Sequence, residues 1–75
     1  MKILINKTND VTEFYNICTR YSGDIDVSSD KYVVDGKSVL GLFSLALDKP
    51  VEVRINTPNK NEEETFYAEI CKFIA

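Results

Sequence analysis

Apolar residues along this chain of 75 residues switch repeatedly between two spacings. Alternation with polar residues, which is typical of a half-buried strand, surrounds Ile25 and returns from Val51 to Ile55. A spacing of three to four residues, which indicates an amphipathic helix, runs from Val11 to Tyr21 and returns from Phe66 onward. So short a chain holds one thin core, so both patterns must share a single domain, expected to span residues 1–75.

The full order of expected elements is β-α-β-β-α-β-α. The expected elements are a strand at 2–6, a helix at 11–21, strands at 24–28 and 32–34, a helix at 39–47, a strand at 51–55 and a helix at 62–74. Ser29–Lys31 is expected to be the turn of a hairpin between the second and third strands, and Asp35-Gly36 ends the third strand. Mixed elements with an internal hairpin favour an α+β fold, with an antiparallel four-stranded sheet covered on one face by helices.

Side chains that can cap the helices set their expected ends. Asp10 is expected to be the N-cap of the first helix, with Glu13 as its capping-box partner. Ser38 is expected to cap the second helix, and Asn59 or Asn61 the last. Gly23 follows the first helix, where a residue that tolerates positive φ is favoured.

Charge and hydropathy narrow the class of partner. Nine basic and twelve acidic residues give a net charge of −3, which opposes non-specific binding to nucleic acid. No apolar stretch approaches the roughly 20 residues of a membrane span, and the first residues do not resemble a signal peptide. We therefore expect a soluble cytoplasmic protein whose partners are proteins, with no nucleic acid and no membrane.

The chain contains no histidine, which removes much of the chemistry of active sites. Serine or cysteine nucleophiles activated by histidine and histidine-based metal sites are excluded. We expect no enzyme activity, no cofactor and no metal. Cys18 and Cys71 lie on or beside apolar helix stripes and are expected to be buried free thiols.

Two short motifs have ordinary explanations. Gly36-Lys37-Ser38 matches the end of a phosphate-binding P-loop, but the first glycine of that motif is replaced by Lys31 and the following helix is short. The run Glu62–Glu64 suits the positive end of the last helix dipole better than a cation site, because consecutive helical residues do not converge.

The most apolar part of the chain, Val39–Leu47, is its most unusual feature. Leu42, Leu45 and Leu47 suffice to close a core, so other apolar residues of this helix are expected to face solvent. An exposed apolar patch usually marks a surface that binds a partner. The alternative is a helix wedged in a corner and covered on two sides.

The segment Lys37–Leu45 resembles the regulatory-serine segment of the HPr family, the small phosphocarriers of the bacterial sugar phosphotransferase system. Tyr21–Ile25 looks like the stretch of that family that ends helix one and enters strand two, and the expected element order is also that of HPr. The resemblance spans nearly the whole chain and implies the open-faced β-sandwich of HPr.

The resemblance fails at the phosphocarrier site. HPr carries a phosphorylatable histidine just before its first helix, and in-register counting places Lys7 on that histidine and Asn9 on its supporting arginine. Asp10 adds a carboxylate at the helix end that a phosphohistidine would use. Phosphoryl relay through histidine is therefore not expected.

Other family features carry over by position. Ser38 matches the serine that HPr kinase phosphorylates in Gram-positive relatives. Val39, Leu40 and Phe43 match the apolar docking surface of the family, with Arg20 and Lys37 as expected basic neighbours. The resemblance implies a regulatory or adaptor module whose partners are phosphotransferase-system components, HPr kinase or a transcription regulator. There are two alternatives. The protein competes for the docking surface of the transferase in the phosphotransferase system, or it has an unrelated interaction or structural role on the same fold.

Overall fold

The computed structural model describes residues 1–30, 32–45 and 48–75. The elements in chain order are β1 (Lys2–Ile3), α1 (Thr8–Cys18), β2 (Asp24–Ser28), β3 (Val33–Asp35), α2 (Val39–Ser44), β4 (Val51–Asn56), α3 (Lys60–Ile70) and the 3₁₀ turn η1 (Cys71–Phe73). This is the α+β order that the sequence predicts. The tight turn expected at 29–31 and the end of the second helix include residues 31, 46 and 47, which lie outside the described residues.

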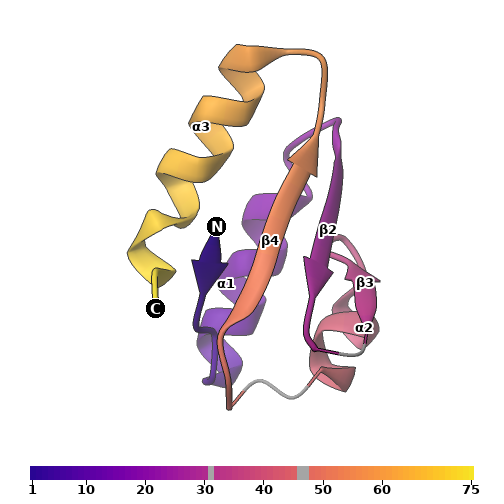
Figure 1. Ribbon diagram of the computed structural model, residues 1–75, viewed down its shortest axis with the longest axis vertical. Coiled ribbons are helices and arrows are strands. Elements are labelled where there is room, and N and C mark those ends of the chain that lie inside the picture. The colour runs from indigo at the N-terminus through magenta and orange to yellow at the C-terminus, as the bar shows by residue number, and fades with distance from the viewer. Residues whose placement is uncertain (31, 46–47) are drawn as a thin grey trace.

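The four strands form one antiparallel sheet in the order β1-β4-β2-β3. In Figure 1, α1 and α2 lie behind the sheet and α3 lies beside β1, so the face toward the viewer is open. Alternation explains this one-sided cover: along β4 Val51, Val53 and Ile55 are buried, whereas the residues between them are exposed. The predicted open-faced sheet is confirmed.

The core lies between the sheet and the helices, and its buried side chains among the described residues are aliphatic, aromatic or cysteine. Phe14 and Phe73 meet edge to face with ring centroids 6.4 Å apart, and Tyr21 meets Phe66 in the same way at 5.2 Å. Such aromatic contacts add about 0.5–1.5 kcal/mol each beyond the burial of their surface. Among the described residues no helix is long and apolar enough to cross a membrane.

The first helix begins earlier than the sequence predicts. Lys7 is its N-cap residue, without a side-chain cap hydrogen bond, so the expected capping box of Asp10 and Glu13 is wrong. Asp10 instead lies inside the first turn, where its charge still suits the helix dipole. Glu13 forms an ion pair with Lys72 from the opposite end of the chain.

The expectation of a positive φ at Gly23 is also wrong, because no described residue has one. Glycine is favoured at this position because the neighbouring atoms leave no space for a side chain. A Cβ atom at this position would lie 2.9 Å from the Asn56 carbonyl oxygen and 2.9 Å from the Thr57 Cβ. Gly23 thus lets the turn before β2 lie directly against the end of β4.

The end of the chain departs from the predicted helix. Asn59 caps α3 by accepting hydrogen bonds from the backbone N–H groups of Asn61 and Glu62, as one of the two expected caps. The helix stops at Ile70, and Ile74 bridges to Ile3 with its side chain 58% exposed, so its predicted place in the buried stripe is wrong.

The two cysteines have different environments. Cys18 is fully buried, as expected, and burial raises the pKa of its thiol to about 12. Cys71 is exposed, because it begins η1 on the solvent side, so the prediction of two buried thiols is half wrong. Both thiols are free.

Candidate functional site

The start of α2 is organised by Ser38. Its Oγ accepts a hydrogen bond from the Gly41 N–H at 3.2 Å, and its carbonyl accepts one from Leu42 N at 3.0 Å. This is the N-cap that the sequence predicts. The Ser38 N–H in turn donates to the Asp35 carbonyl at 3.0 Å, which ties α2 to the end of β3. The position and orientation of α2 therefore depend on this serine.

The short helix α2 divides sharply into buried and exposed residues. Leu42 is fully buried, and Leu45, just past the helix, is 6% exposed. On the other side Leu40 is 82% exposed, Phe43 46% and Val39 38%. We call Val39, Leu40 and Phe43 the α2 surface. A helix of six residues thus supplies its core contact with one side and leaves three large apolar side chains in solvent.

Lys37 does not extend freely beside the α2 surface. Its Nζ donates a hydrogen bond to the backbone carbonyl of Tyr21, in the turn that follows α1. Its backbone N–H donates to the Asp35 Oδ1 at 2.8 Å. Lys37 is half-buried and links the end of α1 to the beginning of α2.

Arg20 lies in the same turn and is engaged with α3. Its guanidinium donates to Glu69 at 2.7 Å, while the Tyr21 hydroxyl donates to the other oxygen of that carboxylate. Burial, followed by this hydrogen bond, raises the pKa of Tyr21 to about 12. The structure therefore ties Arg20 to α3, whereas the sequence predicts a basic neighbour of the docking surface.

Lys7 and Asn9 lie at the beginning of α1. Both are exposed, and no side-chain hydrogen bond or ion pair joins either of them to another residue of the described ranges. α1 contacts α2, so the two helices that carry the predicted phosphocarrier and serine sites are neighbours. No described group of three or more Cys, Asp or Glu residues could hold a metal ion.

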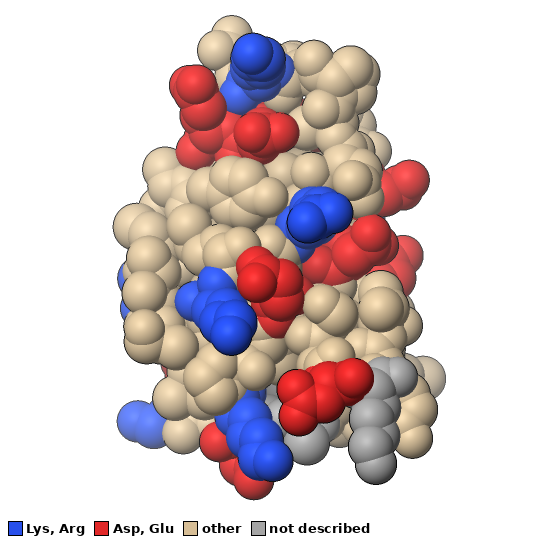
Figure 2. All heavy atoms as spheres, in the orientation of Figure 1, with Lys and Arg blue, Asp and Glu red and all other residues tan. Residues whose placement is uncertain are grey.

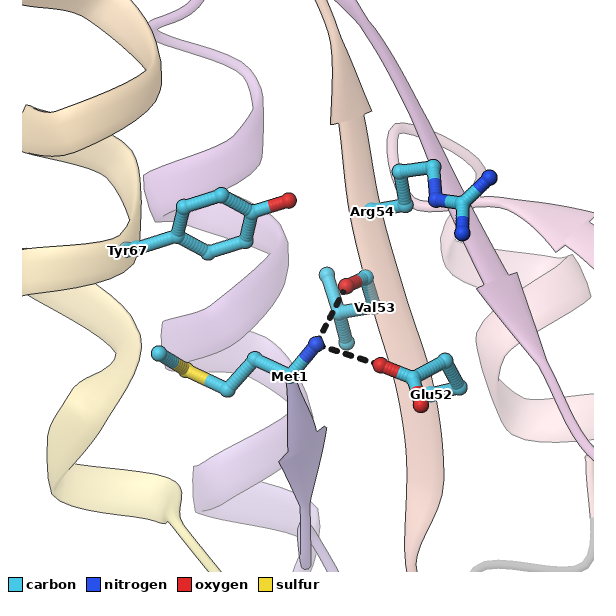
Figure 3. A pocket seen from close by; sticks show the side chains of 5 residues that line it. All are labelled: Met1, Glu52, Val53, Arg54 and Tyr67. Carbon is cyan, nitrogen blue, oxygen red and sulfur yellow. Dashed lines mark hydrogen bonds and ion pairs between the residues drawn. The ribbon is translucent and has the colours of Figure 1, made fainter.

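A shallow hollow lies on the other side of the molecule, between β4 and α3 (Figure 3). The Met1 amine bonds to the Glu52 carboxylate and to the Val53 carbonyl, whereas the Arg54 guanidinium points away. The amine lowers the pKa of Glu52, chiefly through this hydrogen bond. The Met1 amine and the Glu52 carboxylate already form an ion pair with each other. The residues that line the hollow do not place a nucleophile beside a general base.

The sequence pattern does not predict the exposure of two further apolar residues, which lie in or just before β3, the strand that α2 contacts. Tyr32, just before β3, is 66% exposed, and Val33, the first residue of β3, is 68% exposed. The available signal was their adjacency, because consecutive strand residues point to opposite faces and cannot both enter the core.

Comparison with known proteins assigns the family. The family model described as "PTS HPr component phosphorylation site" matches residues 8–75. A comparison with curated protein sequences gives no significant match.

Solved structures agree with the fold. HPr-C-His from Thermoanaerobacter tengcongensis superposes with a TM-score of 0.76 at 19% identity, covering 96% of this chain and 89% of that one. Crh from Bacillus subtilis, a catabolite repression protein seen as a swapped dimer, superposes with a TM-score of 0.70 at 22% identity, covering 100% of this chain and 88% of that one. On the match over residues 8–75, the chain belongs to the HPr family of the phosphotransferase system.

Proposed function

We propose that this member of the HPr family is a regulatory or adaptor module that binds proteins through the α2 surface and does not relay phosphate through histidine. The observation that carries the proposal is the exposure of Leu40, 82%, two residues from the fully buried Leu42. The core does not need Leu40, so a role in binding accounts for a large apolar side chain at this place.

The geometry of the α2 surface suits an interface centre. Leu40 and Phe43 lie three residues apart on the helix, so their side chains project to the same side. Buried apolar anchors of this kind contribute most of the binding energy in protein interfaces. The helix itself is held in place by the Ser38 cap and by Leu42, so little ordering is needed on binding.

Loss of phosphocarrier chemistry follows from the residue types present. The chain has no histidine, and Lys7 and Asn9 stand in the segment where the family carries its phosphorylated histidine and supporting arginine. A lysine amine is protonated at neutral pH and does not replace an imidazole as phosphoryl acceptor. We expect no acid-labile phosphoryl transfer from the first enzyme of the phosphotransferase system.

Phosphorylation of Ser38 is a separate part of the proposal. A phosphate here would face the free backbone N–H groups at the start of α2. Asp35 lies close by, because its carbonyl accepts a hydrogen bond from the Ser38 N–H, and its carboxylate opposes a second negative charge. Incubation with HPr kinase and ATP, followed by intact mass and peptide mapping, tests this step independently of docking.

The docking experiment uses purified partners of the phosphotransferase system. The isotope-labelled full chain is titrated with the first enzyme and, separately, with HPr kinase, and amide shifts are mapped. We expect shifts centred on α2 and a loss of binding in Leu40→Glu. Ile74→Glu is the matched control, because Ile74 is also a large exposed apolar residue but lies at the other end of the chain.

Equal binding by Leu40→Glu and the unchanged chain would contradict docking through the α2 surface. Binding of neither protein by the unchanged chain would contradict the assignment of these partners. It would favour the alternative of a different interaction role on the HPr fold.

A further inference from the structure

The free edge of the sheet lies at β3. At the opposite edge the chain end closes β1, because Leu4 N donates to the Phe73 carbonyl at 2.8 Å. Farther along β4 the Tyr67 hydroxyl accepts a hydrogen bond from Ile55 N at 3.3 Å. Within the described residues, β3 is therefore the edge that remains available to another strand (Figure 1).

Two backbone hydrogen bonds fix which groups of β3 point toward its neighbour. Ser29 N donates to the Tyr32 carbonyl at 2.9 Å. Gly36 N donates to the Ile25 carbonyl at 2.7 Å. Hydrogen-bonded and non-hydrogen-bonded pairs alternate along an antiparallel ladder. Val34, midway between these two bonds, therefore directs its backbone groups toward β2.

The residues on either side of Val34 direct their backbone groups outward, away from the sheet. Val33 thus presents both its N–H and its carbonyl, and Asp35 presents its N–H. The Asp35 carbonyl accepts from Ser38 N at 3.0 Å. The described residues provide no partner for the other three groups. These groups have the spacing that an added antiparallel strand would satisfy.

A like-charge pair lies at this edge on the open face of the sheet. Asp35 stands directly opposite Asp26, at a non-hydrogen-bonded position, where side chains approach most closely. Facing like charges destabilise a sheet. The hydrogen-bond partners of these carboxylates are neutral: Asn56 Nδ2 donates to Asp26 at 3.0 Å, and the backbone N–H of Lys37 donates to Asp35. Arg54 of β4 stands opposite Asp26 on its other side, away from Asp35. No ion pair in the described ranges includes either aspartate.

Figure 2 shows acidic side chains gathered over the β2 and β3 side of the open face, beside a basic side chain nearer the middle of that face. A basic side chain on an added strand would lie beside Asp35 on this face. It would relieve the repulsion between Asp35 and Asp26. The charge of the edge thus favours a basic partner.

The helix-covered side of the same edge is apolar. Gly41 of α2 packs so closely on β3 that a Cβ atom there would lie 3.2 Å from the Val34 Cβ. Side chains of an added strand that point to this side would therefore meet α2 and the exposed ring of Tyr32. The open face of this edge therefore favours basic side chains, and the helix-covered face favours apolar ones. Successive side chains of a strand point to opposite faces, so one strand can supply both.

The geometry points to strand addition at β3: this edge binds an extended segment of a partner protein in which basic residues alternate with apolar residues. The basic side chains lie on the open face beside Asp35 and Asp26, and the apolar ones lie beside α2. The backbone groups of Val33 and Asp35 hold the segment in register. This inference goes beyond the proposed function and does not depend on binding through the α2 surface.

Synthetic peptides test the inference on the full chain. The first probe is a hexapeptide of alternating lysine and valine with blocked ends, and the second replaces lysine by glutamate. A third keeps the lysine sequence but carries backbone N-methyl groups at the alternate residues whose N–H groups would face β3, which removes these donors and places methyl groups between the strands. We expect the first peptide to bind about tenfold more tightly than the others at low salt, with amide shifts at Val33 and Asp35.

Two substitutions in the chain test the two halves of the inference. Val33→Pro removes an N–H that points away from β2, so the fold tolerates it as an edge proline, and the lysine peptide should bind about five- to tenfold more weakly. Asp35→Asn keeps the Oδ1 acceptor for Lys37 N but should abolish the preference for lysine over glutamate. Glu63→Gln, the same charge change on α3, should preserve that preference.

Three results would overturn the inference. One is equal affinity for the lysine and glutamate peptides. Another is unchanged affinity for the N-methylated peptide, which remains decisive if Val33→Pro fails to fold. The third comes from sedimentation without peptide: self-association that Val33→Pro abolishes would mean that a second copy of the chain occupies the edge.

Discussion

The Tyr21 hydroxyl donates a hydrogen bond to the Glu69 carboxylate, which joins the turn after α1 to the last part of α3. The ring of the same tyrosine packs edge to face on Phe66 at 5.2 Å. Tyr21→Phe keeps the ring contact and removes only the donor, so the free energy of unfolding should fall by about 1.5–3 kcal/mol, the range for a bond to a charged acceptor. Urea unfolding measures the change.

Arg20→Gln is the control for the same carboxylate. Arg20 is 61% exposed, and exposed ion pairs contribute about 0–1 kcal/mol. A larger loss in Arg20→Gln than in Tyr21→Phe would contradict the view that the phenol is the principal tie to α3.

Stability should decline as the solution becomes acidic, in part through Glu62. A hydrogen bond from the Ser22 hydroxyl at 2.9 Å is the main cause that lowers the pKa of Glu62, and the Gly23 N–H adds to it. Because the pKa is lower in the folded chain, the stabilisation is present above the unfolded-state pKa and is lost as pH falls through the folded-state value. Unfolding by urea at a series of acidic pH values measures this slope.

Glu62→Gln should flatten that pH dependence. Glu63→Gln changes the net charge equally, and its side chain forms no hydrogen bond with the described residues, so it serves as the control. If both variants leave the acid slope unchanged, the contacts of Glu62 with the turn do not stabilise the fold.

Ser38→Ala should destabilise the protein by about 0.5–2 kcal/mol, because the Gly41 N–H loses its cap acceptor. Ser44→Ala is the matched control within the same helix. Ser44 donates to the Gly41 carbonyl at 2.6 Å from an exposed position, so its loss should matter less. Equal stability of Ser38→Ala and the unchanged chain in urea unfolding would contradict the capping role.

Substitution of two leucines of α2 should change the stability of the protein by very different amounts. Leu42→Ala removes a fully buried side chain and should cost about 2–5 kcal/mol. Leu40→Glu places a charge on a side chain that is 82% exposed and should change stability by less than about 0.5 kcal/mol. Thermal melts of the two variants test this before any partner is known. A strongly lowered transition for Leu40→Glu would mean that Leu40 belongs to the core.

Patterns with one strong local cause could be predicted from the sequence, and contacts distant along the chain could not. The alternation in β4 and the caps at Ser38 and Asn59 depend on neighbouring residues, and all three are confirmed. The predicted start of α1 is wrong because Asp10 and Glu13 fit a local capping rule, whereas Glu13 pairs with Lys72 from the far end of the chain.

The residues of the candidate site show the same difference between local patterns, which could be predicted, and distant contacts, which could not. The exposure of Leu40 followed from counting more apolar residues in α2 than a core can take. Lys37 and Arg20, by contrast, are held by Tyr21 and Glu69 through contacts across the fold that no spacing reveals. The facing aspartates at 26 and 35 depend on the strand register, which a sequence does not specify by itself.

The two thiols should react at very different rates with an aromatic disulfide reagent. Cys71 is exposed, so the reagent can reach its thiol and the reaction at about pH 8 should be fast in the folded protein. Cys18 is fully buried with a pKa of about 12, so it is both inaccessible and un-ionised. Folded protein should therefore release a single equivalent of the reagent anion, and a second only in denaturant. Cys71→Ser should remove the fast equivalent and leave the slow one. Fast modification of Cys71→Ser under native conditions would show that the core between α1 and the sheet opens readily, contrary to the packing around Cys18.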